Sequence, residues 1–383
     1  MSEHLSGKKV LIFGAGGRVG LQLAETLLQN SVNVVGVDVL PQDNLTARLS
    51  RVLIDAELSG LTALGAFKVY GAVSVLDQDV IANIIQTESP DIVVNYAIPF
   101  TWDATKSLPN YKEISAAGLG AFAPIQALAP LNIGRAMKSV NSNATFVVGN
   151  LPDITIPILY GCSHAFDMAL PVAGAGNVGL IATAIKHYLS STTSYDGEDL
   201  TIYLVCHHVH WVAPREPGYP NDKPFKLTIS HQGSDITAEF GDSRVLMNTA
   251  INYCYEDGAG FSSTTGILAA RLVMALLDDS GQSHYMHVPA PNGLDGGYPV
   301  CVKNGELFLN LPTGWNENEL RDGMKQATQG DGIESISAEG HITFQQATLD
   351  ILKAEMGIEM PRAVTPETLE EVAQMQIRIA QSL

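Results

Sequence analysis

The sequence predicts an α/β fold in which a doubly wound parallel sheet is followed by an α+β domain. Over roughly the first 150 residues, short apolar runs alternate with segments of helical spacing. The apolar runs are continuous, which is typical of parallel strands buried on both faces. After about residue 160 the pattern changes to hairpins and longer helices. We therefore expect one domain over residues 1–160 and a second, α+β domain over residues 161–383.

The expected elements follow from these patterns in chain order. In the first domain we expect strands at residues 9–13, 32–39, 67–71, 91–97 and 144–149, with helices at 20–29, 79–87 and 116–140. In the second domain we expect helices at 177–189, 244–255 and 264–277, a strand at 200–206, and hairpins at 225–240 and 299–311. Thr365 and Pro366 predict the start of a C-terminal helix.

Composition and charge narrow the possible partners. The 383-residue chain has 22 Lys and Arg against 40 Asp and Glu, a net charge of −18. Nucleic acid is not expected as a partner, because binding it needs clustered cations. No apolar run is long enough to span a membrane. The four cysteines are widely spaced and the first residues lack a signal peptide's apolar stretch, so we expect a cytoplasmic protein that acts on a small molecule.

A glycine-rich turn joins the first expected strand to the first helix. Residues 14–20 read GAGGRVG, and glycines there let a pyrophosphate approach the N–H groups at the helix start. Asp38 ends the second strand, where a carboxylate can bind an adenosine ribose and repel a 2′-phosphate. The pattern predicts a Rossmann domain that favours NAD over NADP; the alternative is an ordinary turn in which Asp38 caps a loop. The residues expected at the dinucleotide are Gly14, Gly17, Arg18, Val19, Gly20, Asp38, Ala97 and Asn150.

Two enzyme groups have a glycine turn of this kind. The segment at residues 89–97, SPDIVVNYA, resembles the fourth strand of the short-chain dehydrogenases and sugar epimerases. Their chemistry uses a Tyr and a Lys four positions apart on one helix face, where the ammonium lowers the pKa of the phenol. We expect no Tyr with a Lys four residues later in this chain, which argues against this group.

Three other segments resemble the malate and lactate dehydrogenase superfamily. Residues 143–155 resemble the strand and Asn-Pro-x-Asp turn that end its nucleotide domain, although Leu151 is inserted after Asn150. Residues 204–214, LVCHHVHWVAP, resemble the segment that carries its catalytic histidine, which aligns with His208. The resemblance implies self-association, a general base at His208, and substrate contacts from Asn150 and from Ser262 in the segment GFSSTTG. An imidazole suits the role of base because it exchanges a proton near neutral pH.

The sequence departs from this family at the substrate. The family has a carboxylate that orients the histidine and an arginine that grips the substrate on one helix, and residues 176–185 contain neither. The mobile-loop arginine is also absent between Pro99 and Lys112. Arg215 is a candidate for binding an anion, and Asp167 for orienting His208. We therefore expect an NAD-dependent oxidoreductase for a secondary alcohol, a hydroxy acid or polyol-like molecule, without naming the substrate.

Two alternatives stay open. The family 4 glycosidases, relatives in the same superfamily, use NAD and a metal, and the segment HHVHW resembles part of their Asn-His-x-x-Trp signature. In that reading Cys162 and His208 would hold Mn or Zn, whereas our primary prediction includes no metal site. The other alternative is a non-catalytic protein that binds NAD. Replacing His208 distinguishes an enzyme from such a sensor.

Overall fold

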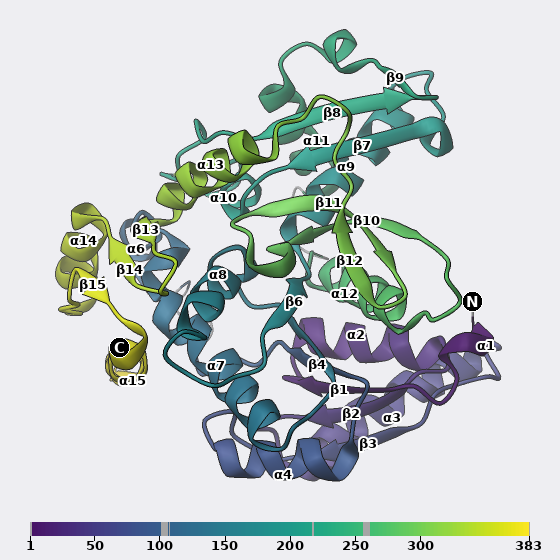
Figure 1. The fold of residues 1–383 in the computed structure, drawn as a ribbon, viewed down its shortest axis with the longest axis vertical. Coiled ribbons are helices and arrows are strands. Elements are labelled where there is room, and N and C mark those ends of the chain that lie inside the picture. The colour runs from purple at the N-terminus through teal and green to yellow at the C-terminus, as the bar shows by residue number, and fades with distance from the viewer. Residues whose placement is uncertain (1, 101–105, 107, 217, 256–260, 383) are drawn as a thin grey trace.

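The protein folds around a six-stranded parallel sheet (Figure 1). The computed structural model describes residues 2–100, 106, 108–216, 218–255 and 261–382. The strands lie in the order β3-β2-β1-β4-β5-β6, the doubly wound order of a Rossmann fold. Their bounds are β1 Lys9–Phe13, β2 Asn33–Val37, β3 Phe67–Tyr70, β4 Ile92–Asn95, β5 Thr145–Val148 and β6 Pro171–Gly174. The predicted α/β fold with a doubly wound parallel sheet is confirmed.

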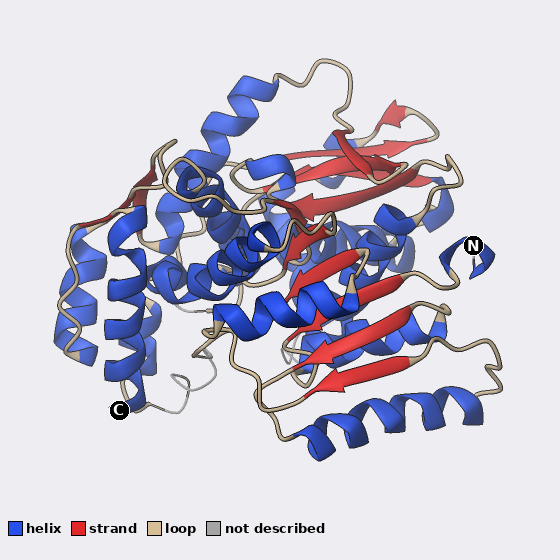
Figure 2. Cartoon of the chain, turned by 60° about the horizontal axis from the view of Figure 1, so that its bottom comes forward, coloured by secondary structure: helices blue, strands red, loops and turns tan. Residues whose placement is uncertain are grey.

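Helices cover both faces of this sheet (Figure 2). They include α2 Arg18–Gln29, α3 Gln42–Leu58, α4 Gln78–Glu88, α7 Ala123–Ser139, α8 Pro152–Cys162 and α12 Phe261–Leu277. In β1, Leu11 and Phe13 belong to one core with α4 and α7, whereas Val10 and Ile12 belong to another with α2 and α12. Because successive strand side chains point to opposite faces, this double burial requires the continuous apolar strands seen in the sequence.

The first half differs from the predictions in three places. β6 lies beyond residue 160, so the sheet extends past the expected end of the first domain. The helix expected at 116–140 is α7 preceded by a 3-10 turn, η1 (Leu119–Phe122), because Gly118 has a positive φ of 81° that an α-helix cannot contain. Neither α3 nor α8 has a counterpart among the predicted elements. Nearly all of α8 is buried and it contains Pro157, so its sequence has no helical stripe.

Three antiparallel sheets follow the parallel one. They are formed by β7 Leu200–Val205, β8 Lys226–His231 and β9 Ser234–Asp235; by β10 His284–Pro289, β11 Gly297–Lys303 and β12 Glu306–Leu309; and by β13 Ile333–Ile336, β14 Ile342–Phe344 and β15 Ala363–Val364. The second arm of the hairpin expected at 225–240 is limited to β9, and η3 (Thr237–Phe240) replaces the rest. Asp235 accepts hydrogen bonds from the N–H and hydroxyl of Thr237, which turns the chain out of the strand.

The helices of this half surround the antiparallel sheets. They are α9 Asn177–Thr192, α10 His208–Val212, α11 Ser243–Tyr255, α13 Glu317–Thr328, α14 Gln346–Met356 and α15 Pro366–Ser382. Three short 3-10 turns belong to the same half: η2 Gly197–Asp199, η4 Pro291–Gly293 and η5 Gln329–Asp331. The first half has two further short helices, α1 Ser2–Leu5 and α6 Tyr111–Ser115. In the part of the chain that the structure describes, no helix is long and apolar enough to cross a membrane.

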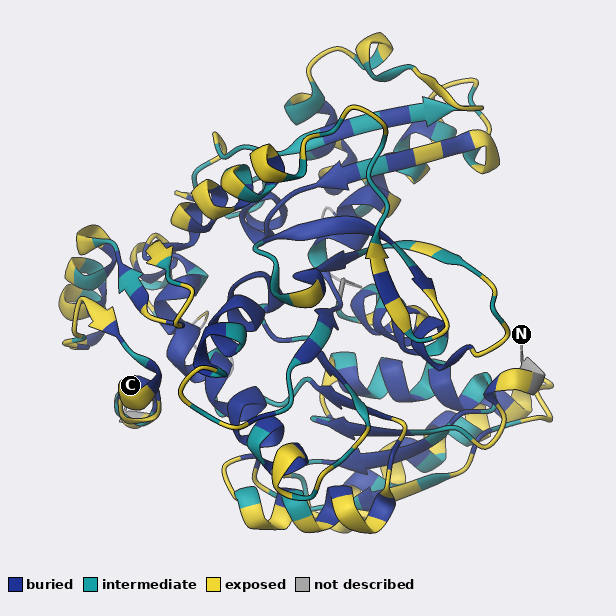
Figure 3. Ribbon diagram, viewed as in Figure 1, coloured by how far each residue is buried: buried dark blue, intermediate teal, exposed yellow. Residues whose placement is uncertain are grey.

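The C-terminal segment folds back onto the first half of the chain. α15 packs against α7, and α14 packs against α6; Figure 1 shows this yellow region at the side of the molecule. η5 lies against η1, where a side chain on Gly118 or Gly120 would collide with the backbone of Asp331. Figure 3 shows buried residues filling the centre of the molecule. The return of the chain thus brings Asp331 from the C-terminal region into the interior.

Candidate active site

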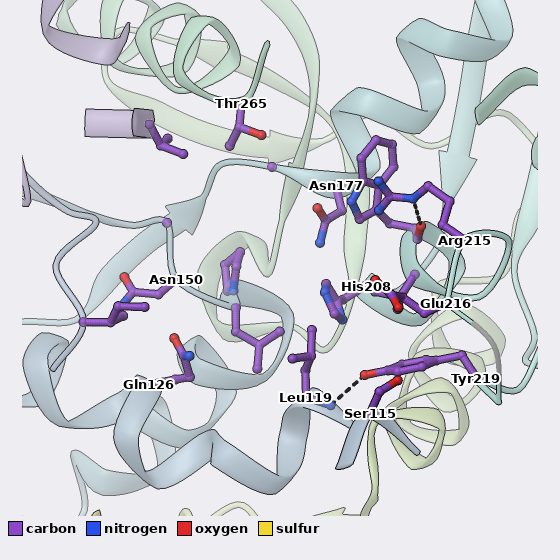
Figure 4. Close-up of a pocket in the computed structure, with 18 of the residues that line it drawn as sticks. Ser115, Leu119, Gln126, Asn150, Asn177, His208, Arg215, Glu216, Tyr219 and Thr265 are labelled. Atoms are coloured by element: carbon purple, nitrogen blue, oxygen red, sulfur yellow. Dashed lines mark hydrogen bonds between the residues drawn. The ribbon is translucent and has the colours of Figure 1, made fainter. Parts of the chain in front are cut away.

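A cavity of about 750 Å³ opens at the carboxyl edge of the parallel sheet. Tyr96 follows β4, Asn150 follows β5 and Gly176 follows β6, and all three line it. Ligands of doubly wound sheets bind at this edge, where the strand order reverses. Figure 4 shows that His208 lies in the middle of the site, between Asn150 on one side and Arg215 on the other.

The glycine turn packs closely against neighbouring backbone, and Val19 at its end lines the cavity. Gly14 has a positive φ of 82°, and a Cβ there would lie 2.7 Å from the amide nitrogen of Ala97. At Gly20 a Cβ would collide with the carbonyl of Gly14, whereas at Gly17 it would lie 3.3 Å from that oxygen. Gly14 and Gly20 therefore hold the turn close to β4 and α2, and Gly17 is the least constrained of the three.

Asp38 organises the same turn. It directly follows β2, and its Oδ2 accepts a hydrogen bond from Gly16 N at 2.8 Å while its Oδ1 accepts one from Leu40 N at 3.0 Å. Arg48 of α3 donates to the carbonyl of Gly16. The carboxylate thus fixes the loop and also lies beside the turn, so both interpretations drawn from the sequence are compatible with it. The cradle free of side chains and the neighbouring carboxylate fit a dinucleotide.

Of the remaining residues expected at the dinucleotide, Val19 lines the cavity and Arg18 is exposed at the start of α2. The carbonyl of Ala97 accepts hydrogen bonds from Asn150 Nδ2 at 3.0 Å and Asn95 Nδ2 at 3.2 Å. Asn95 also donates to Asn150 Oδ1 at 2.9 Å. These bonds hold the ends of β4 and β5 together at the floor of the cavity.

The inserted residue Leu151 has a specific structural role. Its φ and ψ of 41° and 51° are in the left-handed region, where a branched side chain is strained. It forms the N-terminal cap position of α8 and lines the cavity. The insertion therefore turns the chain sharply between β5 and α8 and presents an apolar side chain next to Asn150.

His208 faces the cavity and pairs with a buried carboxylate. It begins α10, and its Nδ1 lies 3.2 Å from Oδ2 and 3.3 Å from Oδ1 of Asp331, which is fully buried. Burial would raise the pKa of Asp331, but the imidazoles of His208 and His207 hold that pKa well below its usual range. Tyr219 donates to Asp331 Oδ1 at 3.3 Å and accepts from Leu119 N at 2.6 Å. The carboxylate is therefore ionised and held in place, and it fixes the orientation of the His208 ring.

The other two histidines of the cluster do not line the cavity. His210 Nδ1 accepts a hydrogen bond from His207 N at 3.0 Å, and its Nε2 donates to the carbonyl of Lys223 at 3.1 Å. Burial lowers the pKa of His210 to about 4, so this ring is neutral and closes the start of α10. His207 is completely buried, and its Nδ1 lies 3.3 Å from Oδ2 of Asp331.

Two residues predicted at the site lie elsewhere. Asp167, proposed to orient His208, is exposed and forms an ion pair with Lys138 at 3.3 Å; Asp331 occupies that role in the structure. Sequence gave no signal for it, because an aspartate between Gly330 and Gly332 is typical of a turn. Ser262 is absent from the described lining of the cavity, whereas Thr265 lines it. α12 begins at Phe261, so the hydroxyl that reaches the cavity comes from the next turn of the helix.

The metal site of the glycosidase alternative does not fit this arrangement. Cys162 ends α8 in the hydrophobic core and does not line the cavity with His208. Burial raises the pKa of its thiol to about 12, which disfavours the thiolate that a metal would need. Among the residues that the structure describes, no three His, Cys, Asp or Glu side chains are grouped to hold a metal ion.

The opposite wall of the cavity is polar and contains a cation. The Arg215 guanidinium stacks 3.9 Å from the Trp211 ring and donates through Nε to the Trp211 carbonyl at 3.1 Å. Asn177 lies on the same side as Arg215, whereas Gln126 lines the cavity on the side of Asn150 (Figure 4). The Ser115 hydroxyl lines it too, is buried and has no hydrogen-bond partner. This wall therefore offers the Arg215 cation, the neighbouring Glu216 carboxylate and neutral hydrogen-bonding groups, and Lys106 also lines the cavity.

The expectation that no Tyr has a Lys four residues later is wrong, because Tyr219 and Lys223 have this spacing. The structure places them in a loop interrupted by Pro220. The Lys223 ammonium lies 4.0 Å from Asp222, and the Tyr219 hydroxyl is bound to Asp331. Burial and Asp331 raise the pKa of Tyr219, which is the opposite of what the epimerase chemistry requires.

Comparison with known proteins agrees with the nucleotide fold. Residues 10–118 match the model of the NAD dependent epimerase/dehydratase family. The lactate dehydrogenase from Eimeria maxima, solved with NADH and oxamate, superposes with a TM-score of 0.54 at 14% identity, covering 84% of this chain and 91% of that chain. The chain has a Rossmann fold similar to that of a dehydrogenase. No curated protein matches the sequence. The family match ends before the histidine cluster.

Proposed function

We propose that this protein is an NAD-dependent oxidoreductase that transfers a hydride between a secondary alcohol and the nicotinamide, with His208 as general acid and base. The observation that carries the proposal is the pairing of His208 with the buried Asp331 in a cavity that is also lined by Val19, from the glycine-rich segment. A dehydrogenase needs these two features side by side, because the proton of the alcohol must leave when its carbon is oxidised.

His208 and Asp331 divide the work of proton transfer. Asp331 accepts a hydrogen bond from Nδ1, so Nε2 is the nitrogen that exchanges a proton with the substrate hydroxyl. In oxidation, Nε2 takes the hydroxyl proton and the ring becomes a cation, which the carboxylate stabilises. In the reverse direction, Nε2 returns the proton to the carbonyl oxygen. The low exposure of His208, 6%, limits exchange of that proton with bulk water.

The cofactor would lie along the carboxyl edge of the sheet. Gly14 and Gly20 allow the tight turn whose N–H groups would face the pyrophosphate, Asp38 would bind the adenosine ribose, and Asn150 and Val19 would face the nicotinamide end. When bound, NAD supplies the acceptor or donor for the hydride. Thr265 of α12 supplies a hydroxyl on the same side of the cavity.

The polar wall supports a hydroxy acid or a polyol-like substrate. Arg215 would bind an anionic group, since a guanidinium offers parallel donors to a carboxylate. Ser115, Gln126 and Asn177 would bond to further hydroxyl groups. The two arginines with which the malate and lactate dehydrogenases bind a small substrate are absent here, and Arg215 with neutral polar groups takes their place. A substrate larger than a simple 2-hydroxy acid therefore fits the site best. We also propose that the protein self-associates, which light scattering after size exclusion would test.

Two measurements on matched variants test the function. Wild type, His208→Gln and His231→Asn are compared for NAD binding by calorimetry and for NAD reduction with a panel of hydroxy acids and polyols. His231 lies on β8, outside the cavity lining, and serves as the control. We expect His208→Gln to lower kcat/KM about 10²- to 10⁴-fold with unchanged NAD affinity.

The outcomes separate the alternatives. Turnover that survives in His208→Gln would remove the proposed role of this residue. NAD binding without turnover on any alcohol would favour a non-catalytic NAD-binding protein. Absence of NAD binding would overturn the proposal as a whole.

A further inference from the structure

Two adjacent histidines share one buried carboxylate behind the cavity. His207 caps α10 and His208 begins it. Their Nδ1 atoms lie 3.3 Å and 3.2 Å, respectively, from the same oxygen, Oδ2 of Asp331. The His207 side chain is fully buried and does not line the cavity, so it cannot touch a substrate.

The surroundings of His207 place a hydrogen on both of its ring nitrogens. Nδ1 lies 3.3 Å from Asp331 Oδ2 and also 3.4 Å from Val209 N, which donates to it as part of the cap of α10. A hydrogen on Nδ1 gives up that long bond and forms a charge-assisted bond to the carboxylate, which is the stronger of the two. Nε2 lies 3.4 Å from Thr328 Oγ1, whose own hydrogen is donated to the carbonyl of Met324 at 3.2 Å. The threonine oxygen is therefore available as an acceptor, and the ring is best satisfied as an imidazolium.

We propose that His207 is a positioning residue which shares Asp331 with His208 and thereby limits how tightly His208 holds its proton. A cationic His207 neutralises part of the charge that Asp331 would otherwise direct entirely at His208. His208 then releases its proton more readily than it would if Asp331 faced it alone. The proposal rests on the proposed function only in giving His208 its catalytic role.

The other charged groups around the pair favour a proton on His207. Asp153 of α8 and Asp295, which precedes β11, both act on His207, and burial raises the pKa of each of these two carboxyls. His210 on the same helix is neutral. Burial would lower the pKa of His207, but the bond to Asp331 and the charge of Asp153 outweigh it, and the pKa is raised. Arg321 and Lys325 of α13 act on Asp295 rather than on the histidine pair. Asp153 also faces His208.

Two substitutions separate hydrogen bonding from charge. His207→Asn keeps a donor near the position of Nδ1 but cannot become a cation. His207→Gln keeps a donor near Nε2 and leaves Asp331 to His208 alone. The experiment is a ¹⁵N NMR titration of the His208 ring in the cofactor-free protein, with His231→Asn as the control variant.

We expect the titration midpoint of His208 to rise by about one unit, a tenfold gain in proton affinity, in His207→Gln, and by less in His207→Asn. An unchanged or lower midpoint in His207→Gln would overturn the proposal. The wild-type spectrum gives an independent check, since the ¹⁵N shifts of His207 near neutral pH must be those of an imidazolium; a neutral ring would overturn the proposal even if both variants failed to fold. These readouts need no turnover, so they are distinct from a failure of the proposed enzyme activity.

Discussion

The two sides of the cavity are built in different ways. The cofactor side consists of short turns that follow neighbouring strands. Gly14 lies close to Ala97, Asp38 accepts from Gly16 N, and Asn150 donates to the Ala97 carbonyl, so each is held by the adjacent turns. On the catalytic side, His208 starts α10 and Asp331 arrives from a segment more than 100 residues later. The first side repeats a local pattern, whereas the second depends on how the C-terminal region packs.

This difference indicates which part of the site can change. A βα turn that binds a dinucleotide must keep its backbone path, because the bonds to the ligand come from the backbone. A catalytic histidine needs only a carboxylate next to its Nδ1, and that carboxylate can belong to any element that packs nearby. Here η5 delivers Asp331, and α9 presents the neutral Asn177 to the cavity.

The largest effect on the catalytic side is expected from Asp331→Asn. The amide removes the charge that stabilises the His208 cation and can bond the wrong ring tautomer, so kcat/KM should fall about 10³-fold. Steady-state kinetics measure this, with Asp167→Asn as the matched control because Asp167 is exposed and paired with Lys138. Equal losses in both variants would contradict the pairing that we describe.

The same carboxylate predicts a loss of stability in acid. The pKa of Asp331 is lower in the folded than in the unfolded protein, so its contribution is present above its unfolded value near 4 and is lost as pH falls through that value toward the folded one. Chemical denaturation of wild type between pH 3 and pH 6 should therefore show a decline that Asp331→Asn lacks. Parallel curves for the two proteins would show that Asp331 does not contribute.

On the cofactor side we expect a smaller effect, from Gly14→Ala. A Cβ at this positive φ collides with Ala97 and displaces the turn. Calorimetry should show a rise in the Kd for NAD of about 10- to 100-fold, since such strain costs roughly 1–3 kcal/mol. Gly17→Ala is the control, because its Cβ meets only the Gly14 carbonyl, at 3.3 Å. The turn is not the NAD site if both variants bind as wild type does.

The smallest effect concerns the hydroxyl of α12. Replacing Thr265 by Val preserves shape and removes the hydroxyl that lines the cavity, and a lost hydrogen bond of about 1 kcal/mol lowers kcat/KM roughly fivefold. Ser262→Ala should leave the kinetics unchanged. If Ser262→Ala lowered kcat/KM and the Thr265 variant did not, the substrate would be contacted by Ser262, the residue that the family resemblance suggests.

The sequence by itself determined the sheet and the turns that follow its strands. Continuous apolar runs, the glycines at 14–20 and the carboxylate at Asp38 are local signals, because each depends on neighbours a few residues away. The histidine cluster was also visible, since three histidines after an apolar strand are unusual in a core. The sequence pattern hid α8, whose all-round burial removes any amphipathic stripe.

Only the tertiary structure decided which groups surround His208. Asp331 lies 123 residues away from His208 along the chain. The sequence around this aspartate, which lies between two glycines, does not indicate that it pairs with a histidine. Its position depends on the close contact of η5 with Gly118 and Gly120 and on the packing of α15 against α7. Contacts of this kind arise from the summed burial of distant apolar surfaces, which a local pattern does not encode.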